Sequence, residues 1–220
     1  MAEPVRAVLF DLDGTLLDTA PDLGRALNLL RGEESLPPIA LERIRPRVSD
    51  GARGLVQLGF PDAPDGRAEE LRQRLLTHYG LALALDSQPF EGVREMLATL
   101  GSRGIPWGIV TNKSALFTVP LLQAVGLTEG AAVIISGDTT PHRKPHPEPL
   151  LHAARQLRLP PQQCVYVGDA ERDAQAAEAA GMRMLVALFG YAEAARAGAW
   201  TQAGMLESPA ELLAWVDSDS

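Results

Sequence analysis

The fold is decided at the segment Val8-Leu9-Phe10-Asp11-Leu12-Asp13-Gly14-Thr15, where an unbroken apolar run meets two carboxylates and a glycine. The apolar run extends back to Val5 with Arg6 as its one interruption, and it does not alternate, which is typical of a strand that is buried on both faces of a parallel sheet. Gly14 gives the backbone the freedom to turn sharply after the strand. We therefore expect Asp11 and Asp13 to point from the strand end toward a crevice.

Similar apolar runs follow along the chain, and the stretches between them carry apolar residues at helical spacing. These runs predict buried strands at residues 5–10, 105–110, 133–136, 164–167 and 184–188. Helices are expected at residues 91–103, 116–125, 148–157 and 172–180, and a closing helix near residues 207–213. Strands that alternate with helices predict an α/β fold with a doubly wound, Rossmann-like parallel sheet.

Residues 18–88 interrupt this alternation, because they contain no convincing strand. Helical patterns at residues 18–31, 41–45, 51–58 and 67–79 predict an all-helical insert. We expect a core domain made of residues 1–17 and 89–220, and a helical cap domain made of residues 18–88. Such an insert would lie over the carboxyl ends of the strands, where open α/β sheets bind ligands.

Composition and charge exclude several classes of protein. The 220 residues are 46% hydrophobic and 22% charged, which is typical of a soluble globular chain. A net charge of −8 argues against nucleic acid as a partner, and no apolar stretch is long enough for a membrane span. The N-terminus does not resemble a signal peptide. The single cysteine, Cys164, is expected to be a buried structural thiol and indicates a reducing compartment, so we expect a cytoplasmic protein.

The two carboxylates of the opening segment indicate metal-assisted chemistry. Asp11 and Asp13 would repel each other unless a cation or a shared proton lay between them. A divalent metal satisfies this requirement, and it lets one aspartate attack a substrate while the other handles protons. An ordinary turn or a calcium-type loop is the alternative interpretation of the same residues.

Three more polar segments follow predicted strands. Thr111-Asn112-Lys113 offers a hydroxyl and backbone amides that suit a phosphoryl oxygen, although an ordinary helix cap fits equally well. Lys144-Pro145 lies in a proline-rich loop, where a lysine either neutralises phosphate charge or is simply solvated. Asp169, with Asp173 one helical turn later, suggests a metal ligand with an outer-shell partner, or a helix cap. All four segments are expected to meet at one edge of the sheet.

Together these segments resemble the motifs of the haloacid dehalogenase (HAD) superfamily, and the resemblance covers nearly the whole chain. It implies a magnesium-dependent phosphomonoester hydrolase that acts through an aspartyl-phosphate. Asp11 would be the nucleophile, and Asp13 the general acid and then the general base. The resemblance also implies that Thr111, Asn112 and Lys144 bind the phosphoryl group, that Asp11, the main-chain carbonyl of Asp13, and Asp169 hold Mg²⁺, and that Asp173 and Thr15 support its outer shell.

The resemblance narrows further within the superfamily. Asp13 separates its phosphatases and phosphomutases from its dehalogenases, and an insert directly after the first motif is similar to a C1 cap. Residues 17–22, 47–52, 90–93 and 179–182 resemble phosphoglycolate phosphatases. The tail resembles both these enzymes and N-acetylmuramic acid 6-phosphate phosphatases. A small phosphorylated metabolite is the expected partner, and the chain is expected to be a monomer or homodimer.

Cap residues are expected to set specificity, because the core supplies generic phosphate chemistry. Candidates for a loop that closes over the substrate are Ser49, Gly51 and Arg53. Arg47 and Arg53 are candidates for pairing with a second anionic group. Solvated arginines are the alternative. The competing functions are a sugar-phosphate phosphatase, a β-phosphoglucomutase-like phosphomutase that returns the phosphoryl group to sugar, and a catalytically inactive binding protein.

Overall fold

The structure is a computed structural model that describes residues 4–192, 194–198, 200 and 204–218. The chain divides into two compact units. The first, here called the core unit, comprises Met1–Leu17 and Pro89–Ser220, and the second, the insert unit, comprises Asp18–Gln88. The two ends of the predicted core domain, residues 1–3 and 219–220, lie outside the described residues.

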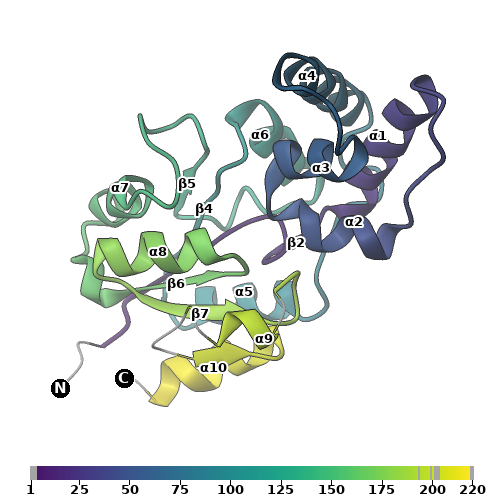
Figure 1. The fold of residues 1–220 in the computed structure, drawn as a ribbon. Helices are drawn as coiled ribbons and strands as arrows, with labels where there is room; N and C mark the ends of the chain where they lie inside the picture. The colour runs from purple at the N-terminus through teal and green to yellow at the C-terminus, as the bar shows by residue number, and fades with distance from the viewer. Residues whose placement is uncertain (1–3, 193, 199, 201–203, 219–220) are drawn as a thin grey trace. The chain divides into compact units, whose positions relative to one another are not determined.

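The core unit is built on a six-stranded parallel sheet with the strand order β5-β4-β1-β6-β7-β8 (Figure 1). Starting from β1, the chain adds β4 and β5 on one side and then crosses to β6, β7 and β8 on the other. This reversal makes the carboxyl end of β1 a point at which open α/β sheets bind ligands. The strands are β1 (Ala7–Phe10), β4 (Trp107–Val110), β5 (Val133–Ile135), β6 (Cys164–Gly168), β7 (Arg183–Ala187) and β8 (Gly204–Leu206).

Helices cover both faces of this sheet. α7 (Glu148–Leu157) and α8 (Glu171–Ala180) pack on one face, and α5 (Val93–Ser102) and α10 (Pro209–Ser218) on the other (Figure 1). The remaining described elements of this unit are α6 (Ala115–Ala124), α9 (Ala194–Ala197) and the 3-10 turn Pro161–Gln163. The predicted α/β fold with a doubly wound parallel sheet is therefore confirmed. No helix in the described part of the chain combines the length and apolar character that a membrane crossing requires.

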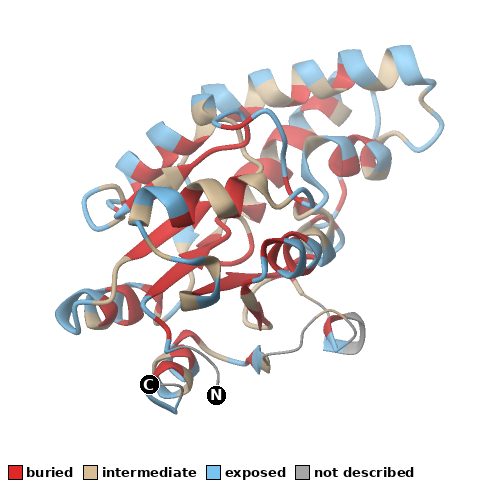
Figure 2. Ribbon diagram, turned by 90° about the vertical axis from the view of Figure 1, so that its left-hand side faces the viewer, coloured by how far each residue is buried: buried red, intermediate tan, exposed pale blue. Residues whose placement is uncertain are grey.

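The central strand β1 is buried along its whole length, and Figure 2 shows the middle of the sheet in the colour of buried residues. Leu9 stands opposite Gly108 of β4 on one side and Tyr166 of β6 on the other. A strand with neighbours on both sides and helices on both faces has no solvated surface. This is why its sequence is an unbroken apolar run, and why the first polar side chain, Asp11, comes only where the strand ends.

The insert unit contains four helices, which are α1 (Ala20–Glu33), α2 (Leu41–Val48), α3 (Gly51–Gly59) and α4 (Asp65–Leu81). They pack on one another through buried leucines such as Leu27, Leu55 and Leu75. The segments at the boundaries of the insert, β2 (Leu17–Asp18) and β3 (Gln88–Pro89), pair as a two-stranded sheet.

The helix α2 is longer than the sequence predicts. The sequence pattern predicts a helix over residues 41–45, but the helix continues through Pro46 to Val48. A proline lacks the N–H that would bond the carbonyl four residues earlier, here that of Glu42. Glu42 is exposed, so water can satisfy that carbonyl, and the remaining turn is short enough to tolerate the loss.

Asp22 joins the two ends of the insert unit. Its carboxylate is 1% exposed and accepts hydrogen bonds from the Ser87 N–H at 3.1 Å, the Ser87 hydroxyl at 2.6 Å and the Asp86 N–H at 3.0 Å. Arg25 forms an ion pair with the same carboxylate. Burial raises the pKa of Asp22, but the hydrogen bonds from Ser87, Arg25 and the Asp86 N–H, together with the charge of Arg25, bring the net pKa below its ordinary value.

Replacing this carboxylate should loosen the insert unit. Asp22→Asn keeps the shape but loses the charge, and we expect it to lower the free energy of unfolding by about 1–3 kcal/mol at neutral pH. Because the folded pKa is depressed, the stabilisation is present above the unfolded pKa and is lost as pH falls through the folded pKa. The difference between wild type and variant should therefore shrink in acid.

Urea denaturation followed by circular dichroism at neutral and acidic pH measures both effects. Asp62→Asn, at an exposed aspartate of the same unit, is the matched control and should change stability by less than about 0.5 kcal/mol. Equal stability of Asp22→Asn and wild type at neutral pH would contradict the role given to this carboxylate.

Candidate active site

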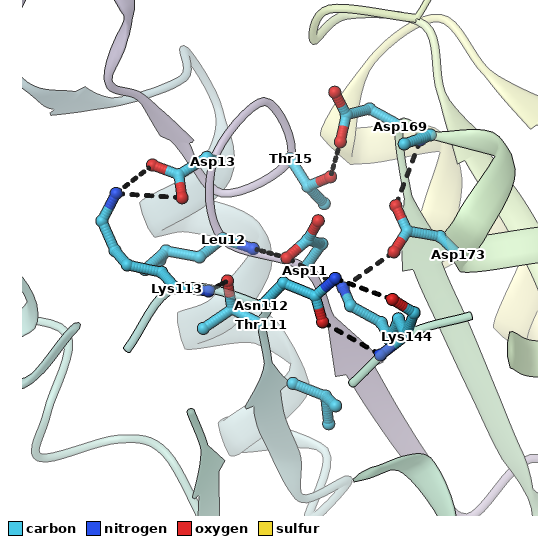
Figure 3. Close-up of polar contacts among 12 residues, drawn as sticks. Asp11, Leu12, Asp13, Thr15, Thr111, Asn112, Lys113, Lys144, Asp169 and Asp173 are labelled. Carbon is cyan, nitrogen blue, oxygen red and sulfur yellow. Dashed lines mark hydrogen bonds and ion pairs between the residues drawn. The ribbon is translucent and has the colours of Figure 1, made fainter. Parts of the chain in front are cut away.

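The carboxyl edge of the sheet gathers polar side chains from four separate parts of the chain. Asp11, Thr111 and Asp169 directly follow β1, β4 and β6, which are neighbours in the sheet. Lys144 comes from the loop between β5 and α7. Figure 3 shows these side chains converging from the strand ends and from the loop that carries Lys144. The structure thus brings together the core residues that the sequence singles out, which are Asp11, Asp13, Thr15, Thr111, Asn112, Lys144, Asp169 and Asp173.

Asp11 is fixed by the backbone on one side and by a lysine on the other. Its N–H donates to the Val167 carbonyl at 2.9 Å, and its Oδ1 accepts the Leu12 N–H at 2.8 Å. The same Oδ1 lies 3.0 Å from Lys144 Nζ. Burial raises the pKa of this carboxyl, but the positive charges of Lys144 and Arg172 and the Leu12 N–H together bring its pKa below the ordinary value. Asp11 is therefore an ionised carboxylate at neutral pH.

Lys144 is buried, with its ammonium between three oxygen atoms. Its Nζ lies 3.0 Å from Asp11 Oδ1, 2.7 Å from Asp173 Oδ1 and 2.6 Å from the Tyr166 hydroxyl. The Asn112 side chain holds the main chain of Lys144, because its Nδ2 donates to the Lys144 carbonyl at 2.9 Å and its Oδ1 accepts the Lys144 N–H at 3.0 Å. The Lys144–Pro145 peptide bond is cis.

Asp13 is paired with Lys113, a residue for which the sequence pattern indicates no separate role. The Lys113 Nζ lies 2.9 Å from Asp13 Oδ1 and 3.1 Å from Oδ2, and the lysine side chain is only 9% exposed (Figure 3). The N–H of Lys113 donates to Thr111 Oγ1 at 3.2 Å. The sequence offers one indication of this role, which is that Lys113 follows a strand end and stands two residues beyond Thr111.

Asp169 and Asp173 lie beside Asp11 at the start of α8. Thr15 Oγ1 donates to Asp169 Oδ1 at 3.3 Å, and Asp173 Oδ2 accepts the Ala170 N–H at 3.1 Å. Asp173 is completely buried. Burial raises the pKa of Asp173 and the charge of Asp11 adds to this, so the pKa stays above its ordinary value even though Lys144 opposes the shift.

The carboxylates of this edge fit a hard divalent cation. Asp11, Asp169 and Asp173 can each offer one oxygen, and these oxygens lie within 4.8 Å of one another. Together they bring three carboxylates into a region that holds two cationic side chains, Lys144 and Arg172. Carboxylate and carbonyl oxygens are the ligands that Mg²⁺ prefers. The described residues of this edge therefore suit Mg²⁺ in both charge and ligand type.

Two further residues near this cluster went unnoticed in the sequence. Tyr166, in the middle of β6, is fully buried, and its hydroxyl donates to the Val110 carbonyl at 2.8 Å. Burial raises the pKa of Tyr166 well above its ordinary value, and the charges of Asp173 and Asp11 add to this effect, so the phenol keeps its proton. Arg172, between Asp169 and Asp173 in the chain, has a buried Nε with no hydrogen-bond partner among the described residues.

The residues predicted to contact substrate from the insert lie around the turn between α2 and α3. Arg47, in the last turn of α2, forms an ion pair with Asp50 at 3.2 Å. Ser49 follows α2 directly, and Arg53 is exposed in α3. The structure therefore keeps these three residues close in the insert unit.

Comparison with known proteins accounts for this arrangement. The sequence model of the haloacid dehalogenase-like hydrolases matches residues 5–181, which is most of the chain. The chain belongs to this family. This HAD-like hydrolase is 47% identical over 186 residues to a phosphoglycolate phosphatase of Xanthomonas campestris pv. campestris, and the match covers 84% of each chain.

Two other relatives of this HAD-like hydrolase cover it more fully. An N-acetylmuramic acid 6-phosphate phosphatase of Pseudomonas aeruginosa is 38% identical over 217 residues, covering 97% of this chain and 95% of the relative. The crystal structure of a predicted phosphoglycolate phosphatase from Haemophilus somnus superposes with a TM-score of 0.84 at 26% identity, covering 96% and 97% of the two chains. The predicted family and the predicted enzyme class, a phosphatase, are thereby confirmed.

Gly14 allows the first motif of this HAD-like hydrolase to approach Asp169. Its φ is +81°, and a Cβ built there would lie 2.3 Å from Asp169 Oδ2. Gly104 has a similar φ of +69°, but a Cβ there would meet nothing within 4 Å. The two glycines therefore share the backbone constraint, but Gly14 also has close neighbours, which are the Asp169 carboxylate and the Tyr191 ring, 2.5 Å from such a Cβ.

A matched pair of substitutions separates the two effects. We expect Gly104→Ala to lower the free energy of unfolding by about 1–2 kcal/mol, the cost of the left-handed conformation for a residue with a Cβ. Gly14→Ala should lower the free energy of unfolding by more than Gly104→Ala does. It should also weaken Mg²⁺ binding, measured by calorimetry, because the methyl group displaces the Asp169 carboxylate. Equal losses of stability in the two variants, with Mg²⁺ binding unchanged, would contradict this reading of Gly14.

Proposed function

We propose that this protein hydrolyses small phosphate monoesters, with Asp11 attacking phosphorus to form an aspartyl-phosphate. The observation that carries the proposal is the placement of Asp11. It is a buried carboxylate at the end of β1, beside which the strand order reverses, and it accepts the Leu12 N–H and lies 3.0 Å from the Lys144 ammonium. An ionised and oriented carboxylate is what nucleophilic catalysis on phosphorus requires.

In this proposal the remaining core residues divide the work of the reaction. Lys144, Thr111 and Asn112 contribute to the phosphoryl site, where Lys144 balances the negative charge of the transferring group and Asn112 keeps the lysine segment in place. Asp13 protonates the leaving oxygen and later takes the proton from the attacking water, since it stands two residues from Asp11 on the same turn. Lys113 orients the Asp13 carboxylate in the free protein.

Mg²⁺ is the proposed cofactor. Asp11, the main-chain carbonyl of Asp13, and Asp169 would hold it, and Asp173 and Thr15 would orient the groups around it. When bound, Mg²⁺ supplies positive charge that offsets the repulsion between a carboxylate nucleophile and an anionic phosphate. Lys144 contributes a fixed charge of the same sign beside Asp11.

The proposed substrate is 2-phosphoglycolate, supported by the named function of the relatives that share 47% identity with this chain. N-acetylmuramic acid 6-phosphate is the second candidate, supported by a relative whose match extends over 97% of the chain. Both compounds carry a carboxylate besides the phosphate. We therefore propose residues 18–88 as a cap domain in which Arg47, Ser49 and Arg53 meet this second anionic group.

A phosphate-release assay tests the proposed function directly. Purified protein is incubated with 2-phosphoglycolate, N-acetylmuramic acid 6-phosphate, hexose phosphates and nucleotides, with Mg²⁺ and after chelation of divalent metals. We expect phosphate release that requires Mg²⁺ and is fastest with a carboxylate-bearing ester. Isomerisation of a hexose phosphate without net phosphate release would instead indicate a phosphomutase, and no reaction with any ester would contradict the proposal.

Substitution of the proposed nucleophile should abolish the reaction. We expect Asp11→Asn to lower kcat by at least about 10³-fold, because an amide cannot form the acyl phosphate. Because the substitution removes a charge from a site with several ion pairs, it can also affect folding. Circular dichroism therefore checks that the variant is folded. A folded Asp11→Asn protein with undiminished phosphate release would remove Asp11 from the chemistry.

The insert arginines can be tested by comparing two substrates. Arg53→Ala should raise KM for a carboxylate-bearing phosphate ester about 10-fold or more while leaving KM for a neutral aryl phosphate nearly unchanged, because only the first presents a second anion. Arg43→Ala, which removes an exposed arginine of α2, is the control and should affect neither substrate. An equal rise in KM for both esters in Arg53→Ala would contradict the proposal that Arg53 binds the second anionic group.

A further inference from the structure

Tyr166 is a polar side chain that the proposed chemistry leaves without a role. It lies in the interior strand β6, opposite Leu9 of β1, and it is 0% exposed. A buried phenol normally finds a hydrogen-bond partner for its hydroxyl. Here the hydroxyl has two partners, and both belong to the carboxyl edge of the sheet.

The directions of these two hydrogen bonds are fixed by the number of protons. The hydroxyl has a single hydrogen, which it donates to the Val110 carbonyl at 2.8 Å. Its lone pair then accepts from Lys144 Nζ at 2.6 Å. Tyr166 thus reaches from β6 to the end of β4, which lies on the far side of β1, and presents an acceptor to the lysine at a defined position.

Lys144 has three ammonium hydrogens and three close oxygen neighbours. Asp11 Oδ1 and Asp173 Oδ1 are the two charged neighbours, at 3.0 and 2.7 Å, and the Tyr166 hydroxyl is the neutral one. A lysine is a point charge on a flexible stem, so its direction must be set by its surroundings. With the hydroxyl removed, the ring would still lie 5.1 Å from the ammonium, measured to its centroid, but among the described residues the two carboxylates would be the oxygen neighbours left to fix the position of the charge.

We propose that Tyr166 is a positioning residue, whose hydroxyl holds the Lys144 ammonium beside Asp11 in the position that phosphoryl transfer requires. The inference rests on the proposed function of this site. Tyr166 contacts no reacting atom in this scheme and acts only through Lys144. A misplacement of about 1 Å in a catalytic group can cost about 10²-fold in rate, so one buried hydrogen bond is enough to matter.

The decisive variant is Tyr166→Phe, which removes one oxygen atom and keeps the ring. We expect kcat/KM for phosphate release to fall about 10- to 100-fold, mostly through kcat, and inorganic phosphate to bind more weakly as a competitive inhibitor in the presence of Mg²⁺. Tyr79→Phe makes the same change at a buried tyrosine of the insert unit and should alter kcat/KM by less than about twofold. Thermal unfolding of both variants is recorded by circular dichroism.

A purely structural role predicts a different pattern. If Tyr166 only stabilised the fold, Tyr166→Phe would lower the melting temperature and leave kcat and the inhibition constant of phosphate unchanged in the folded protein. That outcome would overturn the proposal. So would equal kinetic effects of Tyr166→Phe and Tyr79→Phe.

Double-mutant cycles identify the residue through which Tyr166 acts. The cycles use an aryl phosphate, whose good leaving group keeps slow variants measurable. In the Lys144→Met background, Tyr166→Phe should cause little further loss of kcat/KM. In the Thr111→Ala background, it should cause the same fold-loss as in the wild-type protein. Lys144→Arg gives the same cycle if Lys144→Met does not fold. A full additional loss in both lysine backgrounds, or coupling to Thr111 in place of Lys144, would contradict the inference.

The failure of this inference is distinguishable from the failure of the proposed function. If the wild-type protein releases phosphate from no ester in the panel, the proposed function is wrong. If the wild-type protein is active and Tyr166→Phe behaves like it, only the positioning role is wrong.

Discussion

The rest of the site depends on one interaction, which is the contact of the buried Lys144 ammonium with the oxygen atoms around it. A lysine charge is costly to bury unless carboxylates and hydrogen-bond acceptors surround it, and here Asp11, Asp173 and Tyr166 do so. The carboxylates have the converse requirement, since they would repel one another without a cation between them. Each of these groups is therefore stable in its position because the others are present.

This mutual dependence links the fold to the chemistry. The partners of Lys144 come from the ends or interiors of β1, β6 and α8, and its main chain is held by Asn112 at the end of β4. These four elements and the loop that carries Lys144 must be correctly packed before the ammonium and the carboxylates meet. A doubly wound sheet provides this meeting point where its strand order reverses, beside β1. The same residues then present an ionised Asp11 to a ligand arriving at that edge.

Much of this could be predicted from the sequence, because buried parallel strands leave a clear pattern. The apolar run ending at Phe10 predicts β1, and the carboxylates after it mark the sheet edge. Side-chain pairings could not be predicted in the same way. Nothing in the local pattern tells that Lys113 pairs with Asp13, or that Tyr166 reaches across β1 to Val110. The edge strand β8 also went unpredicted, since three residues in an alanine-rich tail carry too little signal.

The measurement that tests this account most directly is identification of the phosphorylated residue during turnover. Protein mixed with a hydrolysed ester and Mg²⁺ is quenched in acid within the first turnovers, digested, and its peptides are analysed by mass spectrometry. The account predicts a hydroxylamine-sensitive phosphoryl group on Asp11 that forms and decays as phosphate is released. A phosphoryl group on any other residue, or turnover at undiminished rate in protein lacking the Asp11 carboxylate, would contradict it.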